Sequence, residues 1–197
     1  MADSDTFAHF IRRIRAGDSE AARELLQQYE AAIRLEVRLR LRDSRLRRLF
    51  DSMDICQSVL GSFLVRAAAG QYDLDEPEQL LKLLVAMVRN KVAYHARRHQ
   101  TKARDHRRNV TIAPDHWQVA AADPSPSEVV AGRELLHEFR QRLSEEERLL
   151  ADLRAQGKGW AEIATELGGT AQGRRMQLTR AVERILRQLG LEQDSPE

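Results

Sequence analysis

Hydrophobic side chains recur at intervals of three and four residues along almost the whole chain, which is the spacing of amphipathic helices. A first stripe ends before Gly17, and a second begins after the cap-forming pair Asp18 and Ser19. The two stripes consist of Phe7, Phe10, Ile11 and Ile14, and then of Ala22, Leu25, Leu26, Tyr29 and Ile33. No stretch alternates with the period of a β-strand, so the pattern predicts an all-α fold.

Two further helices are expected in the centre of the chain. Asp51 can cap the first of them, with Asp54 in its first turn, and Gly70 stands where a glycine ends a helix. After a short loop at residues 71–76, Pro77 suits the first position of the next helix. The buried stripes are Ile55, Val59, Phe63 and Ala67, and then Leu80, Leu81, Leu84, Val85, Val88 and Val92.

Helical periodicity disappears between residues 109 and 127. Three of the five prolines of the chain, Pro114, Pro124 and Pro126, lie there among Asp, Ser and Ala. Such composition is typical of a linker between domains. The sequence therefore predicts a first small helical domain at residues 1–108, a linker at 109–127, a second domain at 128–190 and a flexible tail at 191–197.

The second domain has the order of elements that a helix-turn-helix requires. Ser144 and Glu147 form a capping box pattern before one helix. A short helix with Trp160 and Ile163 follows, and the glycines at 168 and 169 separate it from a longer basic helix, which Thr170 can cap. The residues that this helix offers to DNA are Gln172, Arg174, Arg175, Gln177 and Arg180. A plain helical hairpin with a solvated arginine face is the alternative.

Charge is unevenly distributed, although 32 basic residues nearly balance 30 acidic ones and the formal net charge is only +2. A dense basic run follows the fourth helical stripe, with Asp105 as its only acidic member. It comprises Arg89, Lys91, Arg97, Arg98, Lys102, Arg104, Arg107 and Arg108. Like charges at this density favour contact with a polyanion over a solvated helix end, so we expect nucleic-acid binding.

Other kinds of site lack support in the sequence. Cys56 is the single cysteine, which excludes an intrachain disulfide and suggests a small core residue. His95 and His99 share a helix face and His106 follows, but no Cys or carboxylate completes a metal site there. There is no glycine-rich phosphate loop and no nucleophile elbow. We therefore expect no enzyme, metal, cofactor or small-molecule substrate.

The N-terminus is acidic and has no apolar signal core, and no apolar run approaches the ~18 residues that span a bilayer. The sequence therefore predicts a cytoplasmic protein without membrane contact.

The segment 51–63, DSMDICQSVLGSF, carries a resemblance to a known family. It is similar to the Asp-x-x-Asp-aliphatic-x-Gln-Glu segment, followed by Phe, of sigma-70 factors of the extracytoplasmic-function type. Those proteins use it to bind a coiled coil of core RNA polymerase. The resemblance implies that Asp51, Asp54, Gln57 and Ser58 bind polymerase, with Ser58 standing where the family usually has Glu.

The segment 84–93, LVAMVRNKVA, resembles the helix with which that family reads and melts the minus-ten promoter element. Here Val88 replaces the usual Ala before Arg-Asn. Tyr72, in the preceding loop, is the candidate for stacking a flipped base. The resemblance assigns the downstream element to Tyr72, Arg89, Asn90, Lys91, Tyr94, Arg97 and Arg98.

The segment 160–168, WAEIATELG, with the basic helix after it resembles the family's reader of the minus-thirty-five element. Gly173 near the start of that helix lowers helix propensity by about 1 kcal/mol relative to Ala.

Together the segments predict a sigma factor that binds core polymerase and promoter DNA and directs promoter-specific initiation. A helix-turn-helix regulator outside the polymerase and an all-helical scaffold protein are the alternatives. An anti-sigma factor remains open as a further partner.

Overall fold

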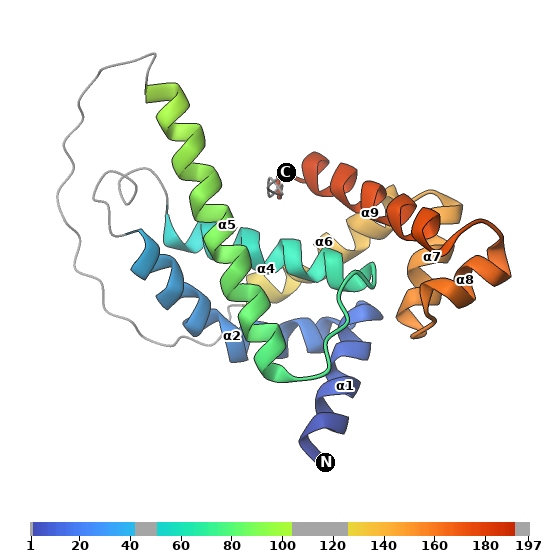
Figure 1. Ribbon diagram of the computed structural model, residues 1–197. Coiled ribbons are helices and arrows are strands. Elements are labelled where there is room, and N and C mark those ends of the chain that lie inside the picture. The colour runs from blue at the N-terminus through green and yellow to red at the C-terminus, as the bar shows by residue number, and fades with distance from the viewer. Residues whose placement is uncertain (1, 42–50, 104–125, 192–197) are drawn as a thin grey trace.

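The computed structural model describes residues 2–41, 51–103 and 126–191, and within them it contains eight helices and no strand (Figure 1). The helices are α1 (Ala2–Arg15), α2 (Ser19–Arg40), α4 (Ser52–Ala68), α5 (Pro77–Ala103), α6 (Pro126–Arg142), α7 (Glu145–Ala155), α8 (Trp160–Leu167) and α9 (Ala171–Gln188). The predicted all-α fold is confirmed. None of these helices has the length and hydrophobicity needed to cross a membrane.

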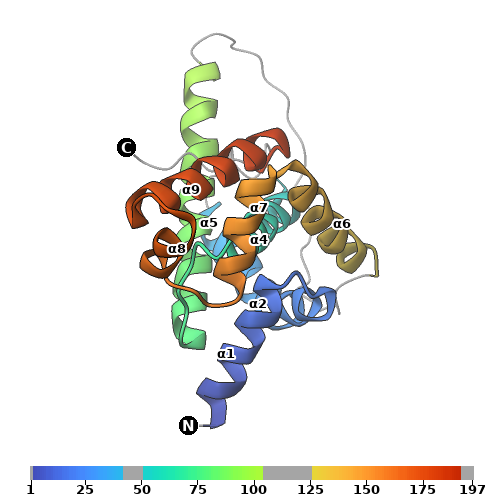
Figure 2. The ribbon, with the colours of Figure 1, turned by 90° about the vertical axis from the view of Figure 1, so that its right-hand side faces the viewer.

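Helix α4 forms the centre of the molecule, because it is apolar on nearly all sides beyond its first turn. It packs against α1, α2, α5 and α6, and it also meets α9. The second half of α5 extends beyond this bundle in both views of the ribbon (Figures 1 and 2). The fully buried side chains of α4 and α5 include Val59, Phe63, Val65, Leu80, Leu84 and Val88.

The predicted helix caps are confirmed. Asp51 accepts a hydrogen bond from the backbone N–H of Met53 at 2.9 Å and so caps α4. Ser144 and Glu147 form both bonds of a capping box at the start of α7. The hydroxyl of Thr170 accepts from the N–H of Gly173 at 3.0 Å at the start of α9.

Helices α7, α8 and α9 form a helix-turn-helix unit that lies together in both views (Figures 1 and 2). Leu150, Ile163, Leu178, Val182 and Ile185 are fully buried in its core. Gly168 and Gly169 make the turn between α8 and α9 with positive φ angles of 76° and 86°, which favour glycine.

Helix α6 begins at Pro126, so the last two residues of the predicted linker are helical, and α6 packs against α2 and α4 of the N-terminal bundle. The helix-turn-helix unit also touches this bundle, through α9 on α4. The N-terminal and C-terminal parts of the chain therefore meet along α4. The predicted domain limits at residues 108, 128 and 190 stay a prediction. Residues 109–125 of the predicted linker at 109–127, and residues 192–197 of the predicted tail at 191–197, lie outside the described residues.

Candidate polymerase-binding and DNA-binding surfaces

The start of α4 is the only part of that helix with a run of exposed polar side chains. Asp51, Asp54 and Gln57 are all exposed, and their three-residue spacing places them along one side of the first turns. Ser58 is half-buried, and its carbonyl accepts a hydrogen bond from the hydroxyl of Ser62 at 2.7 Å. The structure thus groups three of the four predicted polymerase-binding residues and sets Ser58 partly inside.

Along α5, the predicted DNA-binding residues divide between surface and interior. Arg89, Asn90 and Arg97 are exposed, and Tyr94 is half-buried with its ring edge-on to His95 at 5.5 Å. Lys91, in contrast, has an exposed fraction of only 4%. In this conformation Lys91 therefore does not present its ammonium to a phosphate. The side chain of Arg98 lies outside the described residues.

Arg89 has an acidic neighbour on α2. Its Nε lies 3.6 Å from Oε1 of Glu36, which also accepts from Nε of Arg40 at 2.8 Å. The hydrogen bond from Arg40, followed by the contact with Arg89, lowers the pKa of Glu36. Glu36 therefore stays ionised at neutral pH, and a phosphate that binds Arg89 has to compete with its carboxylate.

Tyr72 is packed on the bundle. Its ring stacks on that of Phe63 at 5.8 Å between centroids and 5° between planes. Its hydroxyl faces the sulfur of Met87 at 3.9 Å, and burial raises the pKa of the phenol. Arg15 also donates to the carbonyl of Tyr72 at 2.7 Å. To stack on a flipped base, the ring would have to leave Phe63.

In the helix-turn-helix, Arg174 points into the turn and its side chain is only 16% exposed. Its guanidinium donates to the carbonyls of Leu167 at 2.7 Å and Gly168 at 2.9 Å, and to the carboxylate of Glu146 at 2.5 Å. It therefore satisfies carbonyls at the C-terminal end of α8, which have no partner within that helix, and joins α7, α8 and α9.

Gln177 completes this cluster. It accepts from Nη1 of Arg174 at 3.0 Å and donates to Oε2 of Glu146 at 2.8 Å. The hydrogen bonds from Arg174 and then Gln177 lower the pKa of Glu146. Two of the five predicted base-reading residues are thus engaged within the protein.

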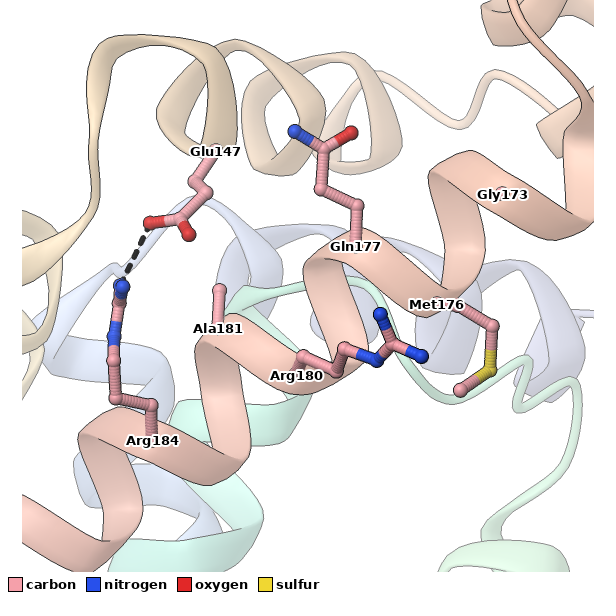
Figure 3. Close-up of a pocket in the computed structure, with 7 residues that line it drawn as sticks. All are labelled: Glu147, Gly173, Met176, Gln177, Arg180, Ala181 and Arg184. Carbon is pink, nitrogen blue, oxygen red and sulfur yellow. Dashed lines mark hydrogen bonds and ion pairs between the residues drawn. The ribbon is translucent and has the colours of Figure 1, made fainter.

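The outward side of α9 carries the other three predicted readers, Gln172, Arg175 and Arg180, all of which are exposed. Beside Arg180 lies an open groove of about 500 Å³ (Figure 3). It is lined by Glu147, Gly173, Met176, Gln177, Arg180, Ala181 and Arg184. Arg184 is tied to Glu147 at 2.8 Å across the groove (Figure 3).

Sequence reasoning missed several residues of these surfaces. Glu146 is the acceptor that fixes Arg174 and Gln177, but it comes 28 residues before Arg174. Met176 is an exposed hydrophobic side chain on the groove, and helical spacing from Gln172 could have identified it. Spacing could also have placed Lys91 inside, because it lies three residues after the buried Val88.

The residues considered for other chemistry lie as follows. Cys56 is buried at 1% exposure and is a small core residue, as predicted. Across the described parts of the chain, no three His, Cys, Asp or Glu side chains gather as metal ligands. His106 and the side chain of His99 are outside the described residues.

A comparison with family models finds that the model described as "ECF sigma factor" matches residues 4–189. No curated protein and no solved structure matches the chain. The match spans both the N-terminal bundle and the helix-turn-helix, and it agrees with the resemblance carried by the segment 51–63. The chain therefore belongs to the ECF sigma factor family, whose role is in transcription initiation.

Proposed function

We propose that this protein binds core RNA polymerase through the start of α4 and directs it to promoters by recognising and melting DNA. One observation carries the proposal. Helix α4 is buried on almost every side, yet it leaves Asp51, Asp54 and Gln57 uncovered at its start. Asp51 also caps the helix, so the same carboxylate can hold α4 in place and face a partner. A partner with basic and amide groups would fit this surface.

The downstream promoter element is assigned to the exposed side of α5. Arg89, Asn90 and Arg97 lie there, with Tyr94 beside them, and Arg98 follows along the chain. Arginines on a projecting helix suit phosphate contact, and an asparagine suits a base edge. Lys91 and Tyr72 join the contact only if their packing changes. Strand opening would draw its free energy from these contacts, without a catalytic step by this chain.

The upstream element is assigned to the outward side of α9. Gln172, Arg175 and Arg180 are the side chains offered to the major groove. Arg174 and Gln177 act as positioning residues, because they hold α9 against α7 and the end of α8. Two weak DNA contacts on one chain gain effective concentration when both elements are within reach. The proposal places the protein in the cytoplasm with the polymerase, and an anti-sigma factor as a further partner stays open.

The experiment replaces Asp54 and Gln57 together by Ala and measures the affinity for core polymerase. Since truncation of central interface residues often costs 2 kcal/mol or more, we expect affinity to fall by roughly thirtyfold. Glu145→Ala with Gln156→Ala removes one carboxylate and one amide from exposed positions at the two ends of α7 and is the control. Unchanged polymerase affinity with intact DNA binding would support a regulator that acts outside the polymerase.

A further inference from the structure

Arg154, on α7 of the helix-turn-helix, reaches into the N-terminal bundle and is only 5% exposed. Its Nε donates to the carbonyl of Gly70 at 3.1 Å, and its Nη2 lies 2.7 Å from the carboxylate of Asp73. Its remaining nitrogen donates to the carbonyl of Lys158 at 2.7 Å, and the guanidinium lies 5.0 Å from the ring centre of Trp160. One buried arginine thus joins the C-terminal unit to the loop that follows α4.

The backbone of the loop allows this approach because residue 70 is glycine. Gly70 has a φ of +64°, and a Cβ placed there would lie 2.5 Å from Cβ of Arg154. Any side chain at this position would therefore push Arg154 away. The close contact needs both the positive φ and the missing side chain of Gly70.

Asp73 receives a second arginine, from the other end of the chain. Arg15 on α1 lies 3.6 Å from the same carboxylate that Arg154 contacts. Burial lowers the pKa of Arg15, and the nearby charge of Arg154 lowers it further, whereas Asp73 raises it. The two guanidinium groups repel each other, and the Asp73 carboxylate offsets that repulsion. Loss of the Asp73 charge should therefore loosen the contact.

A second region of contact lies on small residues of α4. A Cβ added to Gly61 would lie 3.1 Å from Leu135 of α6 and 3.4 Å from Leu191, just after α9. The hydroxyl of Ser62, which has one proton, shares it between the carbonyl of Ser58 and the carbonyl of Leu191, the latter at 2.8 Å. The C-terminal part of the chain is therefore seated on α4 as well as on the loop.

The loop held by Arg154 includes Tyr72, the candidate for stacking a melted base. Gly70 and Asp73, which Arg154 binds, flank Tyr72 along the chain, and its ring lies on Phe63. Two elements centred about 25 base pairs apart are separated by roughly 85 Å of duplex at about 3.4 Å per pair. A helix-turn-helix that touches the loop cannot at the same time bind DNA that far upstream of it.

We propose that in the free chain the helix-turn-helix unit is bound to the Tyr72 loop through Arg154, and that this contact has to break before the loop can bind melted DNA. We call the contact of Arg154 with Gly70 and Asp73 the latch. The inference rests on the proposed function, because it takes the loop as a DNA-binding element. The chain binds single-stranded DNA weakly, because only the fraction of molecules in which the latch is open can bind it. Binding to polymerase and promoter then selects the released form.

Energy transfer between dyes on the full chain tests the closed form without DNA. Dyes at Glu78→Cys on α5 and Ala161→Cys on α8 use exposed sites, while Cys56 is buried. We expect high transfer in the parent chain and lower transfer in Arg154→Ala and in Asp73→Asn. Asp73 lies outside the helix-turn-helix, so Asp73→Asn leaves that unit intact. Lower transfer in this variant therefore cannot come from local unfolding of the kind that Arg154→Ala could cause. Transfer that stays the same in both variants would overturn the latch.

The affinity for random-sequence single-stranded 20-mers of DNA tests whether the helix-turn-helix competes with DNA for the Tyr72 loop. Random sequences are suitable because an aromatic ring stacks on any base. Arg154→Ala removes a positive charge, so simple electrostatics predicts weaker binding. The latch predicts the opposite, binding tighter on the order of tenfold. Arg148→Ala removes the same charge from an exposed site on α7 and should bind no tighter than the parent. A weaker or unchanged affinity of Arg154→Ala would overturn the competition.

A variant with both substitutions distinguishes opening of the latch from a direct effect of the changed charge on DNA binding. If Arg154→Ala and Asp73→Asn both act by opening one contact, their effects on affinity will not add. Additive effects would mean that Asp73 acts only as a negative charge near DNA. Failure of the parent chain to support transcription would count against the proposed function, and the dye measurement would still decide whether the latch exists.

Discussion

The two candidate DNA-binding surfaces of this protein differ in how far their side chains are already positioned to contact DNA. On α9, Arg174 and Gln177 are fixed by Glu146 and by the end of α8, and Gln172, Arg175 and Arg180 face outward. Around α5, Lys91 is buried and the ring of Tyr72 is stacked on Phe63. The difference suits the proposed tasks, because duplex DNA can be read by a preformed helix, whereas binding of melted DNA couples to rearrangement of the protein.

Arg174→Ala should give the largest effect on the preformed side. It leaves the carbonyls of Leu167 and Gly168 and the carboxylate of Glu146 without this donor. We expect unfolding of the helix-turn-helix to become easier by about 2 kcal/mol and upstream-element binding to be lost. Urea unfolding and promoter binding would be measured, with Arg174→Lys as a variant that does not restore the forked contacts. A stable Arg174→Ala chain with altered base preference would instead make Arg174 a base reader.

Arg175→Ala should change binding and leave stability within about 0.5 kcal/mol, because Arg175 is exposed. If Arg175 contacts a base, we expect a loss of about 1–3 kcal/mol that depends on the DNA sequence. If it contacts a phosphate, the slope of log affinity against log salt should fall by about 1 for all sequences. Titrations of duplex promoter DNA at several salt concentrations distinguish the two. If neither the affinity nor the salt slope changes, Arg175 is not part of the DNA-binding surface of α9.

Tyr72→Phe tests the α5 surface, where the Tyr72 ring would have to leave Phe63 to bind DNA. The substitution keeps the ring that stacks on Phe63 and removes only the hydroxyl that faces Met87. We therefore expect stability to change by less than about 0.5 kcal/mol and strand opening to persist. Tyr72→Ala should abolish opening, as followed by fluorescence of an adenine analogue in the promoter. Normal opening by Tyr72→Ala would show that the ring does not stack on DNA.

Glu146 gives the smallest effect, which is a dependence of stability on pH. Hydrogen bonds from Arg174 and Gln177 lower its pKa below the ordinary value of 4.5. The stabilisation is thus present above pH 4.5 and is lost as pH falls through the lowered pKa of the folded state. The difference in stability between the parent chain and Glu146→Gln should persist at neutral pH and vanish in acid. A difference independent of pH would exclude ionised Glu146 as its source.

Local features of this fold could be predicted from the sequence because their causes are local. Asp51, Ser144 and Thr170 cap helices whose first turns follow them directly, and the apolar stripes follow the helix period. Contacts between distant residues could not be predicted in this way. The acceptor of Arg174 is 28 residues away, and Arg154 binds Gly70 across 84 residues. Basic character alone does not distinguish an arginine that faces DNA from one that holds the protein together.

Transcription with purified core polymerase on genomic DNA tests the central claim most directly. The account predicts starts that appear only when this chain is added, and that disappear when Asp54 and Gln57 are replaced by Ala. It also predicts that these starts share two sequence segments upstream, one for each DNA-binding surface. Starts identical to those of core polymerase alone would contradict the account.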